Sequence, residues 1–163
     1  MAQWLRTDGC APRTAAARGC GADMFELKTE PSFDGAHFLA DYYGKCENLH
    51  GHRWRVVAYA RQESLQTKGT MRDMVMDFGV FKKALRSIVG EFDHMFLVEE
   101  GTLKQATVDA LEGEGFTLKM LPFRTTAENL ARYFYGRLEQ EGIPVAQVDV
   151  YETPLNCASY FGE

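Results

Sequence analysis

The segments FELKTEPSFDGAHF (residues 25–38) and HRWRVVAYARQ (residues 52–62) are both rich in aromatic and β-branched residues. This composition is typical of β-strands. Between them lies LADYYGKCENL (residues 39–49), in which a glycine and several polar residues indicate a loop. We therefore expect two neighbouring strands joined by a loop that carries functional side chains.

Periodicity predicts two helices downstream of these strands. Residues 78–92 carry apolar side chains at three- and four-residue steps with lysine and arginine between them, which is the pattern of an amphipathic helix. A second helix is expected near Thr125, because Thr125-Thr126-Ala127-Glu128 has the form of a capping box. Gly142, followed by Pro144, should end this helix.

Residues 148–153 alternate in side-chain character, which predicts a strand, and a last short strand is expected over residues 157–161. The resulting order of strand, strand, helix, helix, strand, strand implies an α+β domain. We expect a four-stranded antiparallel sheet with both helices on one face. Residues 99–123 interrupt this order as an insertion with a short helix and a short strand, in which we identify no chemistry. Because such a sheet has two open edges, we expect sheets from several chains to close into an oligomer.

Length and charge limit the classes of protein to consider. A chain of 163 residues with 45% hydrophobic residues is sufficient for one domain of ordinary size. The net charge of -5 disfavours a nucleic-acid partner, because nucleic-acid modules usually present a basic face. No apolar run reaches the roughly 18 residues of a membrane span, so a membrane partner is not expected either.

Residues 1–23 differ in composition from the rest, with three arginines among alanine, glycine and threonine. We expect a disordered N-terminal extension there, with a transit peptide as the alternative, and one domain over residues 24–163. The four cysteines are widely spaced and form no Cys-x-x-Cys pair. A disulfide framework is therefore not expected, and a reducing cytoplasm is the simpler location.

Three histidines suggest a catalytic zinc site. His50 and His52 are two residues apart, so in an extended strand they project to the same face, and His37 belongs to the neighbouring strand. Catalytic zinc typically takes three protein ligands and leaves a fourth position for water or substrate. Cys46 lies four residues before His50, where a nearby cation would favour its thiolate form and make it a candidate base.

Two further candidates stand outside this cluster. Asp93-His94, after the first predicted helix, holds the one histidine not used for metal, although such a pair is often purely structural. Glu152 ends a valine-rich strand and could bind a planar guanidine-like edge through two parallel hydrogen bonds.

Six motifs in order resemble those of the 6-pyruvoyl-tetrahydropterin synthase and 6-carboxy-tetrahydropterin synthase family. They cover essentially residues 24–163, apart from the insertion at 99–123. The motifs are Phe33-x-x-Ala36-His37, Gly44-Lys45-Cys46-x-x-x-His50-Gly51-His52, Val75-Met76-Asp77-Phe78, Phe92-Asp93-His94-x-x-Leu97, Thr126-Ala127-Glu128-Asn129 and Val150-Tyr151-Glu152-Thr153-Pro154.

The resemblance implies the tunnelling fold, in which trimers close their sheets into a barrel and stack in pairs as homohexamers with active sites between subunits. It implies 7,8-dihydroneopterin triphosphate as the substrate. Carried over residue by residue, it implies Zn²⁺ bound by His37, His50 and His52, with Cys46 as general base. It also implies Asp93 and His94 as the proton relay, Glu152 as the pterin anchor and Thr126 as a further substrate-binding residue.

The spacing and composition of the Cys46 loop bear on which reaction product is formed. The three-residue gap between Cys46 and His50 resembles the 6-carboxy-tetrahydropterin synthases of queuosine precursor synthesis, which release acetaldehyde with triphosphate; mammalian-type pyruvoyl enzymes have a longer spacing. Glu47, directly after Cys46, resembles a possible second base of a bifunctional subgroup that cleaves the pterin side chain to 6-hydroxymethyl-dihydropterin for folate synthesis. A solvated Glu47 with no role is the simpler alternative.

Two other classes compete with this interpretation. One is a zinc-stabilised pterin-binding module without chemistry, in which Cys46 would be a fourth protein ligand. The other is a metal-dependent hydrolase of unrelated small molecules, which the pterin anchor at Glu152 disfavours.

Overall fold

The computed structural model describes residues 23–162, so the extension predicted for residues 1–23 lies outside the described residues except for Asp23. The described chain forms seven strands, three α-helices and one short 3-10 helix. In order they are β1 (Phe25–Thr29), β2 (Ser32–His37), η1 (Lys45–Glu47), β3 (His50–Gln62), α1 (Phe78–Gly90), β4 (Met95–Glu99), α2 (Gln105–Gly113), β5 (Leu118–Leu121), α3 (Ala127–Gln140), β6 (Val145–Thr153) and β7 (Asn156–Tyr160).

These strands form one mixed sheet in the order β5-β4-β2-β3-β6-β7, with β1 also paired to β3. The α+β class is confirmed, but the predicted four-stranded antiparallel sheet is wrong. The antiparallel part contains β1, β2, β3, β6 and β7, whereas β4 and β5 add two parallel pairings beside β2. Strand β4 was not predicted, because its five residues, which follow a turn after α1, are too few to show a clear pattern.

The single strand expected over residues 25–38 is divided in two at Glu30 and Pro31. Proline has no backbone N–H to contribute to a ladder, and here its carbonyl instead accepts a hydrogen bond from Val56 N at 3.0 Å. Both halves still pair with β3, so the division leaves His37 in register with the histidines of that strand.

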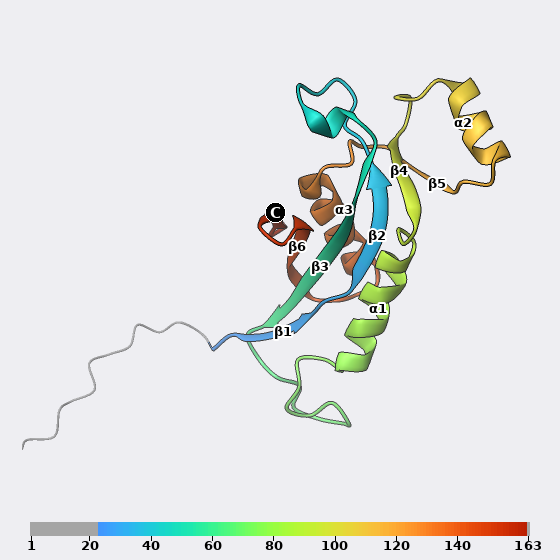
Figure 1. The fold of residues 1–163 in the computed structure, drawn as a ribbon. Helices are drawn as coiled ribbons and strands as arrows, with labels where there is room; N and C mark the ends of the chain where they lie inside the picture. Colours follow the sequence, from blue (N-terminus) through green and yellow to red (C-terminus); the bar gives the residue numbers. More distant parts are fainter. Residues whose placement is uncertain (1–22, 163) are drawn as a thin grey trace, which may run out of the picture.

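The core lies between one face of the sheet and the helices α1 and α3 (Figure 1). Alternate residues of β3 and β6 point into it, and the largest is Trp54, which is fully buried. Besides the two predicted core helices, the structure has α2, the short helix expected in the insertion, which stands apart beside β4 and β5 in Figure 1 and has no buried residue. This third helix lies within the predicted insertion, as does β5.

Helix α3 begins one residue later than its capping box suggested. Thr126 is the N-cap, and its side chain accepts a hydrogen bond from Asn129 N at 3.3 Å. Thr125 is instead completely buried, with its hydroxyl donating to Phe38 O at 3.2 Å. The chain before α3 is thereby bound to the end of β2, where His37 lies.

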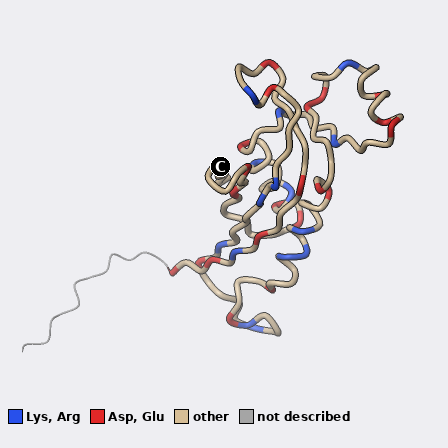
Figure 2. The backbone as a smooth tube through the Cα atoms, viewed as in Figure 1, with Lys and Arg blue, Asp and Glu red and all other residues tan. Residues whose placement is uncertain are grey.

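Acidic and basic residues are interspersed along the described backbone, without a continuous basic face (Figure 2). Among residues 23–162, no helix is long and apolar enough to cross a membrane.

Candidate metal centre and substrate pocket

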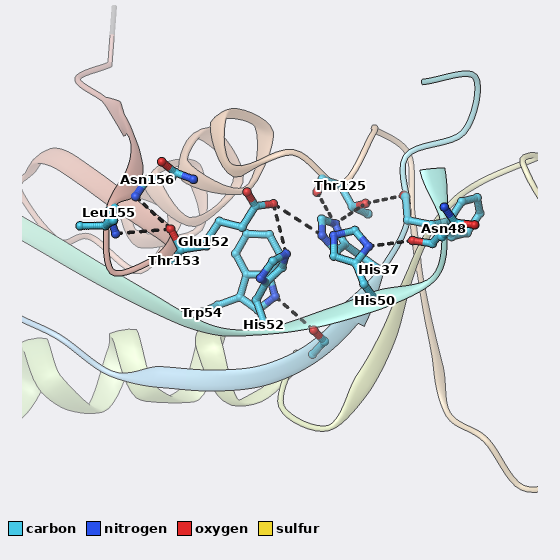
Figure 3. A network of polar contacts seen from close by, with 12 residues as sticks. His37, Asn48, His50, His52, Trp54, Thr125, Glu152, Thr153, Leu155 and Asn156 are labelled. Atoms are coloured by element: carbon cyan, nitrogen blue, oxygen red, sulfur yellow. Dashed lines mark hydrogen bonds and ion pairs between the residues drawn. The ribbon is translucent and has the colours of Figure 1, made fainter. Parts of the chain in front are cut away.

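Sheet register brings three histidines together. In the antiparallel pairing of β2 with β3, His37 lies opposite His50 and Gly35 lies opposite His52. All three imidazoles therefore project from the same face of the sheet, the face that also carries Trp54 (Figure 3). The clustering that the sequence spacing predicted is present.

Backbone carbonyls orient two of the three rings. His37 Nδ1 lies 3.0 Å from Thr125 O, and His50 Nδ1 lies 2.7 Å from Asn48 O. A carbonyl can only accept, so in each ring the proton resides on Nδ1 and the Nε2 lone pair is free. Nε2 of all three histidines is buried without a hydrogen-bond partner in the described part of the chain. Three converging, buried and unpaired nitrogens are the donor set that a metal ion requires.

Glu152 completes this cluster from strand β6. Its Oε1 lies 3.6 Å from Nε2 of both His37 and His52 (Figure 3). One ligand atom from each of the three histidines and Glu152 falls within 4.8 Å of the others. This set does not include Cys46, so the geometry does not favour a closed structural site with a sulfur ligand.

Burial keeps His37 and His52 neutral. His37 is fully buried, and desolvation lowers its pKa to about 4 despite its hydrogen bond to Thr125. Desolvation also lowers the pKa of His52, against the opposing influence of Glu152. The ring of Trp54 packs edge-on against both imidazoles, at centroid distances of 4.9 and 5.3 Å. Near neutral pH these ligands need not lose a proton before they bind a cation.

A pocket of about 300 Å³ adjoins the cluster, and Glu152 is one of its walls. Thr126, the other residue with a predicted substrate-binding role, lines the same pocket, together with Tyr42 and Cys157. The two residues are 26 positions apart in sequence, and the packing of α3 against β6 and β7 brings them together. The pocket therefore offers a carboxylate and a hydroxyl beside the candidate metal centre.

A second hollow, of about 510 Å³, lies on the other side of Glu152 and His52. Arg53 and Arg55 line it, and Arg55 stacks over the ring of Tyr151 at 3.7 Å from its centroid. Because Arg53 and Arg55 alternate with His52 and Trp54 along β3, they project from the opposite face of the sheet. Each is also paired with a carboxylate, Arg53 with Asp34 at 3.3 Å and Arg55 with Glu30 at 3.2 Å.

Cys46 and Glu47 do not touch the histidine cluster within this chain. Cys46 lies in η1 and is half-buried, and no described hydrogen bond joins its thiol to another group. Glu47 lines a different, largely apolar cavity of about 530 Å³ that also includes Phe96 and Leu111. The structure consequently places Glu47 away from the pocket of Thr126 and Glu152.

Asp93 and His94 form the expected pair but also lie apart from the cluster. His94 Nδ1 is 3.1 Å from Asp93 Oδ2, while Asp93 Oδ1 accepts a hydrogen bond from Asp34 N at 2.9 Å. That backbone hydrogen bond is the main reason why the pKa of Asp93 is lowered. His94 has a φ of 59°, and its side chain is 81% exposed. The pair is thus oriented by β2 and presented to the surface of the chain.

Sequence analysis missed Arg124, Thr125 and Trp54, all of which shape the site. Trp54 packs against His37 and His52, and its indole N–H donates to Gly35 O at 3.3 Å. Its position two residues after His52 on the same strand face could have indicated this role. No local pattern distinguished Arg124 and Thr125, because their partners in residues 37–42 are more than 80 positions away.

Comparisons with family models and with curated proteins point to one family. Residues 26–163 match the family model described as 6-pyruvoyl tetrahydropterin synthase. A 6-carboxy-5,6,7,8-tetrahydropterin synthase from Haemophilus influenzae is 32% identical over 143 residues, covering 84% of this chain and 99% of the relative. The protein of the same name from a Synechocystis strain is 33% identical over 140 residues, covering 85% of this chain and 94% of the relative.

Solved structures share the fold. The 6-pyruvoyltetrahydropterin synthase of Plasmodium vivax superposes with a TM-score of 0.63 at 22% identity, covering 85% of this chain and 97% of that one. A further structure of that enzyme carries a substitution of a glutamate described as a catalytic residue. Since the family model spans most of the chain and relatives above 30% identity align over nearly their whole length, this chain belongs to the 6-pyruvoyl tetrahydropterin synthase family.

Proposed function

We propose that this protein is a zinc-dependent 6-carboxy-tetrahydropterin synthase, a lyase that converts 7,8-dihydroneopterin triphosphate and water to 6-carboxy-5,6,7,8-tetrahydropterin, triphosphate and acetaldehyde. One observation carries the proposal: three histidines with buried, unpaired Nε2 atoms adjoin a pocket that contains Thr126 and Glu152. The curated relatives named for this activity support the choice of product. The expected place of action is the cytoplasm, in the synthesis of the queuosine precursor.

The pocket of Thr126 and Glu152 would hold the pterin ring. The Glu152 carboxylate can accept two parallel hydrogen bonds from the amino-pyrimidine edge, which has the shape of a guanidine. The same carboxylate lies close enough to His37 and His52 to be a metal ligand before substrate enters.

Zinc held by His37, His50 and His52 would act as a Lewis acid on the side-chain hydroxyls, which lowers the cost of removing a proton from the adjacent carbon. Cys46, as thiolate, would accept that proton. His94, held by Asp93, would pass protons between the thiol and the substrate.

This relay requires more than one chain. Within one chain Cys46 and His94 share no described contact, and His94 faces outward. We propose that His94 serves the site of a neighbouring subunit in a homohexamer built as a dimer of trimers.

The direct test is to incubate the zinc-loaded protein with 7,8-dihydroneopterin triphosphate and identify the products by mass spectrometry. Formation of 6-carboxy-tetrahydropterin together with acetaldehyde and triphosphate supports the proposal. Formation of 6-pyruvoyl-tetrahydropterin without acetaldehyde would assign the chain to the other activity of the family. Binding without turnover would favour the non-enzymatic pterin-binding module.

A second candidate function is cleavage of the side chain to 6-hydroxymethyl-7,8-dihydropterin. Its support is Glu47, directly after Cys46, and the catalytic glutamate described for the Plasmodium vivax enzyme. The position of Glu47 on the apolar cavity beside α2 argues for elimination as the main reaction.

A further inference from the structure

The loop of residues 38–49 carries Cys46 but has little burial to hold it in place. Residues 41–45 and 47–49 are exposed, and Cys46 is half-buried. Within the loop, Leu39 N donates to Cys46 O at 2.9 Å. Because an exposed segment with few buried contacts opens easily, the position of Cys46 depends on the polar contacts that join this loop to the rest of the molecule.

Arg124 supplies such a contact from the chain segment before α3. Its Nη2 donates to Ala40 O at 2.6 Å, and its guanidinium lies over the ring of Tyr42, 5.7 Å from the centroid. The two ends of the loop are held by Thr125, whose hydroxyl donates to Phe38 O, and by His50, whose Nδ1 bonds Asn48 O. Among the described hydrogen bonds, only that of Arg124 reaches residues 39–47 from outside the loop. Ala40 is adjacent to Leu39, whose amide is bonded to Cys46, so Arg124 acts only two contacts away from the thiol-bearing residue.

Arg124 is itself firmly placed. Its carbonyl accepts hydrogen bonds from Thr126 N at 2.8 Å and from Asn129 Nδ2 at 3.0 Å, both at the start of α3. The next residue, Thr125, orients the candidate metal ligand His37. The segment 124–126 thus joins three parts of the site: the metal centre, the substrate pocket and the Cys46 loop.

The chemistry of this contact is specific to arginine. A planar guanidinium can donate to a carbonyl in its plane while its face stacks on an aromatic ring. The Nε atom of Arg124 is buried without a hydrogen-bond partner in the described part of the chain, so the bond to Ala40 O is the one described hydrogen bond that this side chain makes. A lysine could replace the hydrogen bond but not the stacking.

We propose that Arg124 is a positioning residue of this enzyme, which holds the loop of residues 38–49 so that Cys46 meets the substrate at the metal centre. The proposal rests on the proposed role of Cys46 as base. The same loop contributes Leu39 and Tyr42 to the pocket of Glu152. Loss of the Arg124 contact should therefore lower kcat strongly and raise KM weakly, without removing metal.

The test compares Arg124→Met and Arg124→Lys with Arg132→Met. Arg132 is a matched control, because its guanidinium also lies over a tyrosine ring, that of Tyr160 at 5.5 Å, and no described hydrogen bond joins it to residues 38–49. We expect Arg124→Met to increase both amide hydrogen exchange in residues 39–47 and the alkylation rate of Cys46 by iodoacetamide, each about 10-fold. Its kcat should fall by about 10- to 100-fold, since small misplacements of a reacting group are costly. Metal content per chain should stay at the wild-type value.

Arg124→Lys should recover part of the protection and of kcat, and Arg132→Met should match wild type. Tyr42→Leu is a second variant in case Arg124→Met folds poorly, because Tyr42 is exposed; since Tyr42 also lines the pocket of Glu152, this variant is assessed by exchange and alkylation and not by kcat. It should also increase amide exchange in residues 39–47 and alkylation of Cys46, but by less than Arg124→Met does.

Wild-type exchange and alkylation in Arg124→Met would overturn the proposal, and so would a loosened loop with normal kcat. Equal loss of metal and activity would overturn it too, by showing a general structural role. Exchange and alkylation are measured without substrate. They therefore test the action of Arg124 on the loop separately from the proposed reaction.

Discussion

At the residue scale, hydrogen bonding determines what each histidine of the centre can do. Thr125 O and Asn48 O fix the Nδ1 protons of His37 and His50, and burial disfavours the charged form of His37. The three Nε2 atoms are therefore available as ligands without a conformational change. His37 is the least suitable for mutation because it is fully buried in the core.

The first prediction concerns the two less buried ligands. The double variant His50→Ala, His52→Ala should lose essentially all of its zinc and its activity, because one imidazole and one carboxylate cannot hold the ion at a three-histidine site. It should remain folded, since the core of α1, α3 and the sheet does not include these side chains. Metal analysis after dialysis, with circular dichroism as the folding control, measures this. Retention of one zinc per chain would contradict the ligand assignment.

The second prediction concerns the base. Cys46→Ala should reduce turnover by about 10²-fold or more, the usual effect of losing a general base, with zinc content unchanged. Steady-state kinetics on the zinc-loaded variant provides the measurement. Near-normal turnover would mean that Glu47 or a metal-bound hydroxide takes the proton.

The third prediction separates the two adjacent candidates. Glu47→Gln keeps the shape of the side chain but removes its basic carboxylate. If Glu47 lies away from the reacting atoms, as its place on the α2 cavity indicates, the ratio of 6-carboxy-tetrahydropterin to 6-hydroxymethyl-dihydropterin should not change. A selective fall of the cleavage product in Glu47→Gln, with the reverse in Cys46→Ser, would establish Glu47 as a second base.

At the element scale, Glu91 connects the insertion to the two core helices. At the C-cap of α1, it accepts hydrogen bonds from Arg137 of α3 at 2.7 and 3.1 Å and from Lys119 of β5 at 3.1 Å. The hydrogen bond from Arg137 is the main reason why the pKa of Glu91 falls from 4.5 to about 2.

The fourth prediction follows from that lowered pKa. A carboxyl whose folded pKa lies below its unfolded value stabilises the fold above pH 4.5, and this contribution is lost as pH falls from 4.5 towards about 2. Glu91→Gln should therefore lower the melting temperature at pH 7, and the difference from wild type should shrink below pH 4. Thermal melts across this range give the test, with Glu112→Gln as the control, because Glu112 makes no ion pair among the described residues. A difference that does not depend on pH would show that the Glu91 charge is unimportant.

At the scale of the whole molecule, the described chain contains the three metal ligands and the pocket, but no described contact links Cys46 to His94. Strands β1 and β7 also leave sheet edges on which other chains could add. Both features agree with the oligomer that we propose.

The fifth prediction tests shared sites by mixing inactive variants. Cys46→Ala and His94→Ala subunits, dissociated and reassembled together, should regain a measurable fraction of activity, because some sites then combine an intact Cys46 with an intact neighbouring His94. A mixture of Cys46→Ala and His50→Ala subunits should regain no activity. Each shared site takes Cys46 and His50 from one chain and His94 from its neighbour, so every site in this mixture lacks one of the two residues. Mass measurement by light scattering should give six chains in each case. Absence of recovery in the first mixture would place Cys46 and His94 of one chain in one site.

The sequence by itself determined the antiparallel core, the two amphipathic helices and the clustering of His37, His50 and His52. These features depend on local periodicity and on two-residue spacing, which need no knowledge of distant partners. The parallel pairing of β4 and β5 beside β2 and the position of α2 away from the core were decided by tertiary structure, because the partners of a strand or helix depend on elements distant in sequence.

Tertiary structure alone also decided how the site is built. Thr125, Arg124 and Glu152 come from segments about 85 to 115 residues beyond His37, and only the packing of α3 and β6 on the sheet places them at the histidines and the loop. A side chain's neighbours across such distances depend on how whole elements pack, and local sequence does not encode that packing. For this reason the ligands were predictable from the sequence, while the groups that orient them were not.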